Sequence, residues 1–399
     1  MATAERRVTA GDEMLERVAQ LEPVIRGGAD QAEELRRLPD EVAEALVEAG
    51  FCRLFRPRVW GGLELDPVSA FRVIEELSRI DSAAGWNVTQ ANAMEPMAAW
   101  LSQEAGAAIF GSPDTVLAGS FFAPRRAIPT EGGYRLSGRC AFNSNCHAAT
   151  WICALANVYE DGSGGPTVGE DGHPVTLLTF FPRGEAEIVD NWDTLGMRGT
   201  GSHDIVVDDL FVPSEHAIVF GPLEEPNPAH GGPLHRLTIW HSIGCDAVPA
   251  LGIAQAAIDD FLRLLENRTS SHGGTPPKER SIVQLRLGRA IATLEGARAY
   301  FYGVFRDAWD TALAGRRLDM DAKIRIQAAC SSVPIAAAEA VDLVHSLLGT
   351  SGIRHENPFA RHFRDIHTLT QHAYVSEARF TAVGQVALGL EPDWGFLHF

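Results

Sequence analysis

The first part of the chain has apolar residues at helical spacing. The segment at residues 35–51, LRRLPDEVAEALVEAGF, repeats them every three or four positions, which is typical of an amphipathic helix. Gly50 predicts the end of that helix, because glycine readily adopts the left-handed conformation found there. Asp66 and Pro67 have the residue types of an N-cap and a first helical position. We therefore expect a helical domain at residues 1–115.

Residues 116–225 instead contain short β-branched and aromatic runs separated by Gly, Pro and Asp clusters. Examples are GYRLSGRCAF, TWICALANV and HDIVVDDLFV, whose length and composition are typical of strands. The pattern predicts a central antiparallel β-domain of barrel type. The polar, Gly-rich run at 159–174 is typical of a solvated hairpin tip.

Residues 226–399 return to helical periodicity. Long helical stretches are predicted at about 236–267, 278–313, 319–349 and 358–389. Short connections between such helices favour an antiparallel four-helix bundle. The predicted fold is therefore mainly α, with an N-terminal helical domain, a central β-domain and a C-terminal bundle.

Composition narrows the choice of partners and compartment. The chain has 52 acidic and 34 basic residues and a formal charge of −18, so nucleic acid and anionic membranes would be repelled. We find neither a secretory leader nor an apolar run of about 18 residues, and expect a cytoplasmic protein. The six cysteines form no CxxC pair, which predicts buried, reduced thiols rather than a disulfide framework or zinc site.

Common nucleotide-binding motifs are missing from the sequence. No GxGxxG opens a helix after a strand, and no GxxxxGK[ST] occurs, so neither a Rossmann site nor a P-loop is predicted. The closest string, GMRGTGS at residues 196–202, lies between two predicted strands. It lacks the helix N-terminus that would hold a pyrophosphate.

Histidines near the C-terminus raise the question of a metal site. His362 and His367 would lie about 140° apart around a helix and could not share an ion. His355 precedes the predicted helix. We therefore expect no metal centre.

One stripe of the last predicted helix has the spacing of a functional face. Arg361, Asp365 and His372 stand at i, i+4 and i+11 from one another, so one helix face could carry all three. A structural interpretation is an ion pair between Arg361 and Asp365 beside a packed histidine. A chemical role for His372 is the alternative.

Three segments in order resemble the acyl-CoA dehydrogenases. They are GGYRLSGRCAFNSNCHAATW, WDTLGMRGTGSHDIVVDDLFVP and GIRHENPFARHFRDIHTLTQHA. The resemblance covers the chain from about Phe51 to Leu390. It implies a flavin held between the β-domain and the bundle, and a homotetramer in which neighbouring subunits share the flavin phosphates.

Within this fold, a dehydrogenase needs a carboxylate base to remove the α-proton of a thioester. The position nine residues after Arg364 is Ala373, and a second place for the base falls near Val248 or Ala250. Loss of such a base usually costs about 10² to 10⁴ in rate. We therefore keep an acyl-CoA dehydrogenase-type flavin dehydrogenase or oxidase as the alternative function.

The sequence is more similar to the oxygenase components of two-component flavin monooxygenases, of the 4-hydroxyphenylacetate and dibenzothiophene type. Phe142 and Ser144 match their Phe-x-Ser, and His372 follows the Arg-Asp pair. The resemblance implies reduced FMN or FAD from a separate NAD(P)H:flavin reductase, O₂ as co-substrate, and a C4a-hydroperoxyflavin. A buried hydroxyl at N5 in a dry pocket would protect that species from decay.

The resemblance also implies site residues of three kinds. The catalytic ones are Ser144, His372 and Ser120. Those near the cofactor are Phe142, Asn143, Ser144, Thr200, Gly201, Ser202, Arg268, Gly349 and Gly352. Those lining the substrate pocket are Trp86, Met94, Ser120 and His372.

Two departures from the family pattern bear on the substrate. Met94 stands where phenol hydroxylases carry a histidine, and Ala141 replaces an aromatic residue. Both changes enlarge or soften the pocket, since methionine adapts to irregular shapes. We expect an apolar aromatic or polycyclic substrate, such as a quinone or an indole-like molecule. A helical scaffold that has lost its flavin is the non-enzymatic alternative.

Overall fold

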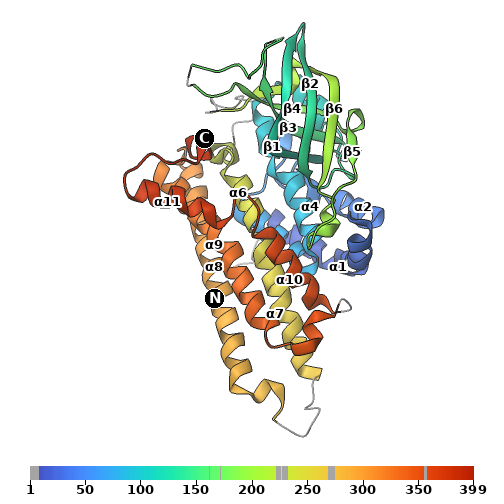
Figure 1. Cartoon of the computed structure of the whole chain (residues 1–399), viewed down its shortest axis with the longest axis vertical. Helices are drawn as coiled ribbons and strands as arrows, with labels where there is room; N and C mark the ends of the chain where they lie inside the picture. Colours follow the sequence, from blue (N-terminus) through green and yellow to red (C-terminus); the bar gives the residue numbers. More distant parts are fainter. Residues whose placement is uncertain are drawn as a thin grey trace, which may run out of the picture.

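The structure is a computed structural model. The residues that it describes are 9–160, 162–170, 172–221, 226, 232–267, 275–354 and 357–399. Figure 1 shows the sheet at one end of the molecule, the long C-terminal helices extending away from it, and the N-terminal helices beside their junction. This arrangement confirms the predicted fold class.

Helices form the N-terminal part of the chain. They are α1 (Ala10–Leu35), α2 (Asp40–Glu48), α3 (Pro67–Ile80), α4 (Ser82–Ala93) and α5 (Gln103–Phe110). The predicted helix ends are confirmed: Gly50 has a φ of +85°, and the Asp66 side chain accepts a 3.0 Å hydrogen bond from the Ser69 amide. Asp81 caps α4 in the same way, through the Ala84 amide at 2.8 Å. That cap fixes the start of a helix that later supplies the site.

A seven-stranded sheet follows. Its strands are β1 (Leu117–Thr130), β2 (Gly133–Asn143), β3 (Trp151–Val158), β4 (Thr176–Pro182), β5 (Glu187–Val189), β6 (His203–Pro213) and β7 (Ala217–Val219), in the order β5-β6-β2-β1-β3-β4-β7. The expectation of purely antiparallel pairing was wrong for one pair, because β1 and β3 run parallel. After the hairpin to β2, the chain crosses back and starts β3 on the other edge of β1. The sheet is therefore mixed.

The C-terminal helices pack lengthwise against one another. They are α7 (Pro249–Asn267), α8 (Ser281–Leu313), α9 (Met320–His345) and α10 (Pro358–Leu369), with α6 (Trp240–Ala247) before them and α11 (Phe380–Ala387) after. None of the described helices is both long and apolar enough to cross a membrane. All six cysteines are buried and free, as predicted.

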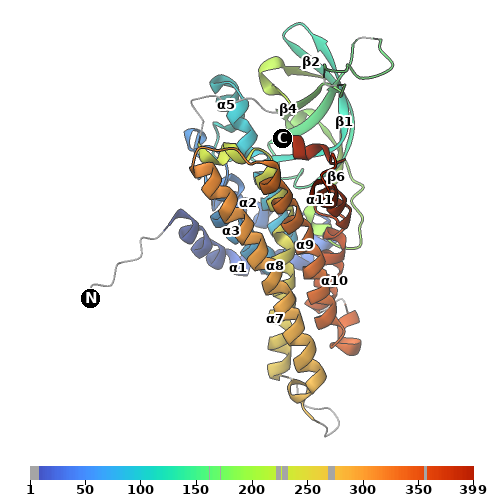
Figure 2. The same cartoon turned by 90° about the vertical axis from the view of Figure 1, so that its left-hand side faces the viewer.

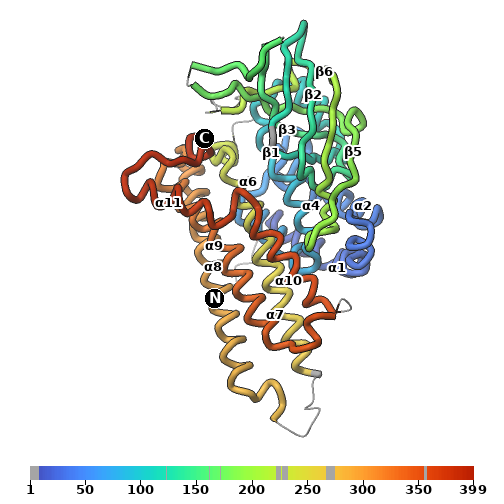
Figure 3. The backbone as a smooth tube through the Cα atoms, viewed as in Figure 1, coloured from blue at the N-terminus to red at the C-terminus, as the bar shows by residue number. Residues whose placement is uncertain are grey.

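The last predicted helix was wrong in its extent. It ends at Leu369, and the tube in Figure 3 turns away there before α11 begins. The Thr370 hydroxyl donates a 2.8 Å hydrogen bond to the His367 carbonyl, the local competition by which threonine disfavours a continuing helix. His372 therefore lies beyond α10, and only Arg361 and Asp365 of the predicted stripe share the helix.

The helical parts share one apolar core. Phe71 of α3 packs against Phe301 and Phe305 of α8, with ring centroids 5.3 and 4.7 Å away. The sheet has its own cluster around Ile152, Phe181 and Ile205. The seam between these two cores is where the N-terminal helices, sheet and bundle meet.

A buried carboxylate crosses that seam. Asp365 of α10 accepts a 2.6 Å hydrogen bond from the Met197 amide, and another from the Ser82 hydroxyl at the start of α4. Burial raises the pKa of Asp365 to about 6. The predicted ion pair between Arg361 and Asp365 was wrong, because Arg361 pairs with Asp30 of α1. Asp365 thus ties α10 to α4 and to the turn before β6.

We expect Asp365→Ala to lower the free energy of unfolding by about 2–4 kcal/mol, because two buried donors lose their acceptor. Asp365→Asn keeps one acceptor and should cost less. Urea unfolding of both variants measures the difference. An alanine variant as stable as the wild type would show that the seam does not depend on this carboxylate.

A second buried group makes stability depend on pH. His241 of α6 is fully buried, with Nε2 3.1 Å from the Ala93 carbonyl and its ring edge-on to Phe55 at 5.4 Å. Burial lowers the pKa of His241 from 6.5 to about 4. The folded state therefore binds fewer protons than the unfolded state between these two values.

Acidification from pH 6.5 to 4 should accordingly reduce the free energy of unfolding by up to about 3 kcal/mol through this group. The contribution is fully present above pH 6.5. His241→Gln cannot take up the proton, so its stability should fall less steeply across the same window. Urea midpoints at closely spaced pH values test this, and parallel curves for the two proteins would contradict it.

Candidate active site

Four of the predicted site residues are joined by one chain of hydrogen bonds. The indole Nε1 of Trp86, on α4, donates to the Ser144 hydroxyl at 3.0 Å. The Ser144 and Ser202 hydroxyls lie 2.6 Å apart, and those of Ser202 and Thr200 lie 2.7 Å apart. Thr200 in turn donates to the Met197 carbonyl at 2.7 Å. Helix, strand end and turn thus meet through a buried row of hydroxyls.

An unusual backbone turn places Ser144 inside. Phe142 and Asn145 have φ angles of +62° and +63°, which non-glycine residues seldom adopt. The buried side-chain amide of Asn143 holds the turn, because its Nδ2 donates to the Cys140 carbonyl at 2.7 Å. Such strain costs of order 1–3 kcal/mol and concentrates at functional sites. Here it turns Phe142 outward and Ser144 inward.

An exposed aromatic wall stands beside this turn. Phe142 and Phe122 are 53% and 58% exposed, and their ring centroids are 5.4 Å apart. Trp192 meets Phe142 edge-on at 6.2 Å. Contiguous exposed apolar patches mark binding surfaces, whereas single exposed apolar residues are common on any protein surface. The wall offers an apolar face to a flat ring system.

His372 lies in the same neighbourhood. Its ring stands edge-on to Trp86 with centroids 5.3 Å apart, and to Tyr374 at 5.5 Å. Trp86 therefore contacts both Ser144 and His372, which are far apart in the sequence. The structure brings these three predicted residues together.

The sequence interpretation missed Asp246. This buried carboxylate of α6 has Oδ2 3.9 Å from Nδ1 of His372, and its Oδ1 accepts a 3.2 Å hydrogen bond from Gln90. Burial raises the pKa of Asp246, while His372 and the bond from Gln90 oppose the rise. A signal was present: Asp246 is the single charged residue within WHSIGCDAVPALG.

Apolar side chains from the C-terminal segment close the far side. Tyr374 packs against Trp394 and Phe396, with ring centroids 5.6 and 5.0 Å away. Burial and the nearby Asp246 raise the pKa of the Tyr374 hydroxyl. Met94 packs against the same apolar cluster as Phe396. Figure 2 shows the C-terminus beside the sheet.

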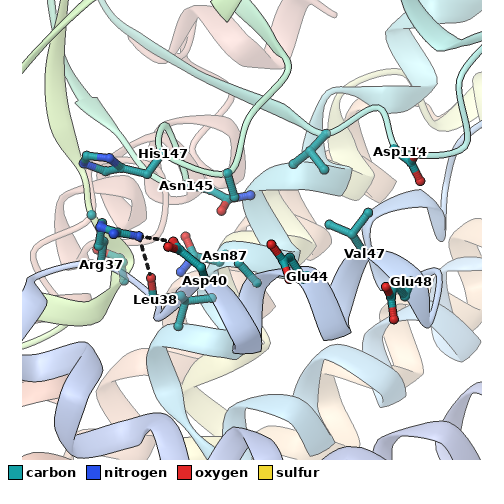
Figure 4. A pocket seen from close by; sticks show the side chains of 15 residues that line it. Arg37, Leu38, Asp40, Glu44, Val47, Glu48, Asn87, Asp114, Asn145 and His147 are labelled. Carbon is teal, nitrogen blue, oxygen red and sulfur yellow. Dashed lines mark hydrogen bonds and ion pairs between the residues drawn. The ribbon is translucent and has the colours of Figure 1, made fainter.

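The structure has a cavity between α2 and the sheet, apart from Ser144 and His372. It has a volume of about 430 Å³ and is shown in Figure 4. Its lining includes Asp40, Glu44, Asn87, Asn145, His147, Thr200 and Gly201. Neither this cavity nor the smaller one at Arg236 and Phe399 is lined by Ser144 or His372. Two predicted site residues do line the first cavity: Thr200, which belongs to the hydroxyl row, and its neighbour Gly201.

The remaining predicted site residues lie outside the hydroxyl row. The Ser120 hydroxyl on β1 accepts a 3.1 Å hydrogen bond from the Phe122 amide. Gly349 and Gly352 lie in the short helix η10 (Gly349–Ile353), which precedes α10, whereas His372 follows it. The helix between them is about 18 Å long. Arg268 and His355 lie outside the described residues.

The other histidines of the last segment have structural partners. His362 Nε2 lies 2.8 Å from Asp260, and His367 Nε2 lies 2.9 Å from Asp342. Within the described residues, no group of three or more His, Cys, Asp or Glu side chains is placed to hold a metal ion.

Family models match both helical parts of the chain. The acyl-CoA dehydrogenase N-terminal domain matches residues 13–109, and the acyl-CoA dehydrogenase C-terminal domain matches residues 245–377. Indole-3-acetate monooxygenase of Pseudomonas putida is 32% identical over 91% of this chain and 90% of its own. The flavin-dependent monooxygenase oxygenase subunit HsaA of Rhodococcus jostii is 28% identical over 90% of this chain and 94% of its own.

Solved structures agree with these relatives. The 3-HSA hydroxylase from Rhodococcus sp. RHA1 superposes with a TM-score of 0.87 at 25% identity, covering 96% of this chain and 98% of that one. XiaF from a Streptomyces species, solved with FADH2 and glycerol, gives 0.88 at 26% identity, covering 96% and 97%. The chain therefore belongs to the flavin-dependent monooxygenases that are built on the acyl-CoA dehydrogenase fold.

Proposed function

We propose that this protein is the oxygenase component of a two-component system. It would take reduced FMN or FAD from a separate NAD(P)H:flavin reductase and use O₂ to oxygenate an apolar aromatic or polycyclic small molecule. The observation that carries the proposal is the Trp86 indole, which contacts both Ser144 and His372 beside an exposed aromatic wall. Relatives named for indole-3-acetate and for FADH(2)-dependent resorcinol hydroxylation support the aromatic class.

The residues present fit a flavin. The wall of Phe122, Phe142 and Trp192 would cover one part of the flat ring, since exposed aromatic faces gain from apolar contact. Ser144, two residues from Phe142, would meet the ring edge at N5. Thr200, Gly201 and Ser202 would support that edge from the next turn, and Asn143 holds the backbone that positions Ser144.

When bound, the reduced flavin would supply the electrons that activate O₂ for transfer of one oxygen atom. The protein would exclude water, since solvent access promotes side reactions. Its apolar groups for this are Trp86, Met94 and Tyr374. The His372 ring, with Nδ1 toward Asp246, leaves Nε2 able to hold or move a proton on the substrate side. Ser120 would lie nearer the substrate than the ring edge.

A flavin dehydrogenase or oxidase remains the second candidate, and one observation favours it. Asp246 places a carboxylate two residues before Val248, near one position where dehydrogenases carry their base. Against it, Asp246 is buried and engaged by Gln90 and His372. A dehydrogenase would bleach bound oxidised flavin on addition of substrate without O₂, whereas the oxygenase would not.

We expect stopped-flow mixing of the protein with reduced FMN and O₂ to give a long-lived absorbance distinct from both reduced and oxidised flavin. Ser144→Ala should shorten its lifetime by about 10-fold or more, because loss of one hydrogen bond to the ring costs about 1–2 kcal/mol. Peroxide release should rise in parallel. Thr179→Val, which removes a buried hydroxyl from β4, is the control.

Immediate formation of free oxidised flavin by the wild type would contradict the oxygenase function. An unchanged lifetime in Ser144→Ala would remove only Ser144 from the mechanism.

We also propose a homotetramer in which Arg268 and the Gly349–Gly352 segment of one subunit reach the flavin phosphates of a neighbour. Support comes from the separation along α10 between η10 and His372, which leaves that segment without a role in its own subunit's site. Sedimentation equilibrium should give four times the chain mass of 43.2 kDa. A monomer would contradict shared sites.

A further inference from the structure

The hydroxyl row has fixed donors and acceptors at its two ends. At one end, the Trp86 indole nitrogen can only donate, so Ser144 accepts in their 3.0 Å contact. At the other, the Met197 carbonyl can only accept, so Thr200 must donate across 2.7 Å. Without a proton between them, two oxygens at that distance would repel each other.

These ends determine every hydroxyl proton between them. Thr200 has given its single proton to Met197, so it accepts from Ser202 across 2.7 Å. Ser202 has then given its proton to Thr200, so it accepts from Ser144 across 2.6 Å. All three side chains are at least 95% buried, so competing water is limited: Ser144 is 5%, Thr200 1% and Ser202 4% exposed.

The consequence falls on Ser144. A hydroxyl has one proton and two lone pairs. Ser144 has donated the proton to Ser202 and used one lone pair for Trp86. Only an acceptor lone pair remains for any further partner.

Flavin N5 changes its hydrogen-bonding character with redox state. Reduced flavin carries an N5–H donor, whereas oxidised flavin presents an N5 lone pair. We propose that the Trp86–Ser144–Ser202–Thr200 row is a redox-state selector: it leaves Ser144 able to accept from reduced flavin and unable to donate to oxidised flavin. This inference rests on the proposed function, which places the ring edge at Ser144.

The selector would suit an oxygenase that receives its flavin already reduced. Oxidised flavin, which is left after the reaction, has no N5–H to donate, so its N5 lone pair would face a lone pair of Ser144. Their repulsion favours release of the oxidised flavin. Ser202 and Thr200 act through Ser144 and are positioning residues in this scheme. Hydrogen bonds to ring nitrogens are one of the means by which proteins tune a cofactor.

The test is anaerobic equilibrium binding of oxidised and dithionite-reduced FMN, with FAD in parallel, followed by tryptophan quenching or calorimetry. The wild type should bind reduced flavin about 10- to 100-fold more tightly, the range expected when one hydrogen bond is exchanged for an unsatisfied contact. Each tenfold in that ratio equals about 30 mV in the two-electron potential of the bound flavin.

Two variants should remove the preference. Ser202→Ala leaves the Ser144 proton without its acceptor, so it can turn to N5 of oxidised flavin. Thr200→Val lets Ser202 donate to Ser144, with the same result, and keeps the test open if the first variant misfolds. In both, oxidised flavin should bind more tightly, and the affinity ratio should fall about 10-fold or more.

Two further variants separate polarity from packing. Trp86→Phe removes one end, but the carbonyl end still polarises the row, so both affinities should weaken while their ratio stays. Thr179→Val removes a matched buried hydroxyl, which donates to the Ala154 carbonyl at 2.8 Å on β4. It should change neither affinity.

The outcomes distinguish the two proposals. A wild type that binds neither form of flavin overturns the proposed function and this inference together. A wild type that prefers reduced flavin, with the same ratio in Ser202→Ala and Thr200→Val, overturns the selector and leaves the proposed function intact. A ratio that collapses in Trp86→Phe also overturns it.

Discussion

The hydrogen bond from the Trp86 indole to the Ser144 hydroxyl is the contact on which the rest of the site depends. It joins α4 of the N-terminal helices to the end of β2, two parts of the chain with separate apolar cores. The indole ring also stands edge-on to the ring of His372, so one side chain contacts both the end of β2 and the C-terminal segment. A rigid aromatic with a single donor is suited to this, because it combines packing area with one directed bond.

Other contacts at the seam support that bond. Asp365 fixes the turn that contains Met197, and the turn supplies the carbonyl at the end of the hydroxyl row. The strained backbone at Phe142 turns one ring outward and one hydroxyl inward. Stability and chemistry therefore share residues, since the same turn both joins the domains and orders the protons.

Much of the fold could be predicted because its signals are local. Helical spacing, the Gly50 and Asp66 ends and the strand composition all act within a few residues. The parallel pairing of β1 with β3 could not be predicted in this way, because it depends on which edge of β1 the returning chain occupies. The end of α10 was also misplaced, because its pattern continues past the hydroxyl bond at Thr370.

Site prediction divided along the same line. Ser144 and His372 were selected through a motif resemblance, and the structure brings them together around Trp86. The row through Ser202 and Thr200 was only implied, since contacts between residues 58 positions apart leave no local pattern. Asp246 was missed because a lone acid in an apolar helix has many structural explanations.

The proposed oxygenase function and the selector both depend on where the flavin ring sits. An anaerobic crystal structure with reduced FMN tests this most directly. We predict N5 within about 3 Å of the Ser144 hydroxyl, with the ring against Phe142 and His372 on its substrate side. A ring seated instead in the cavity between α2 and the sheet, next to Asn87 and Thr200, would contradict it.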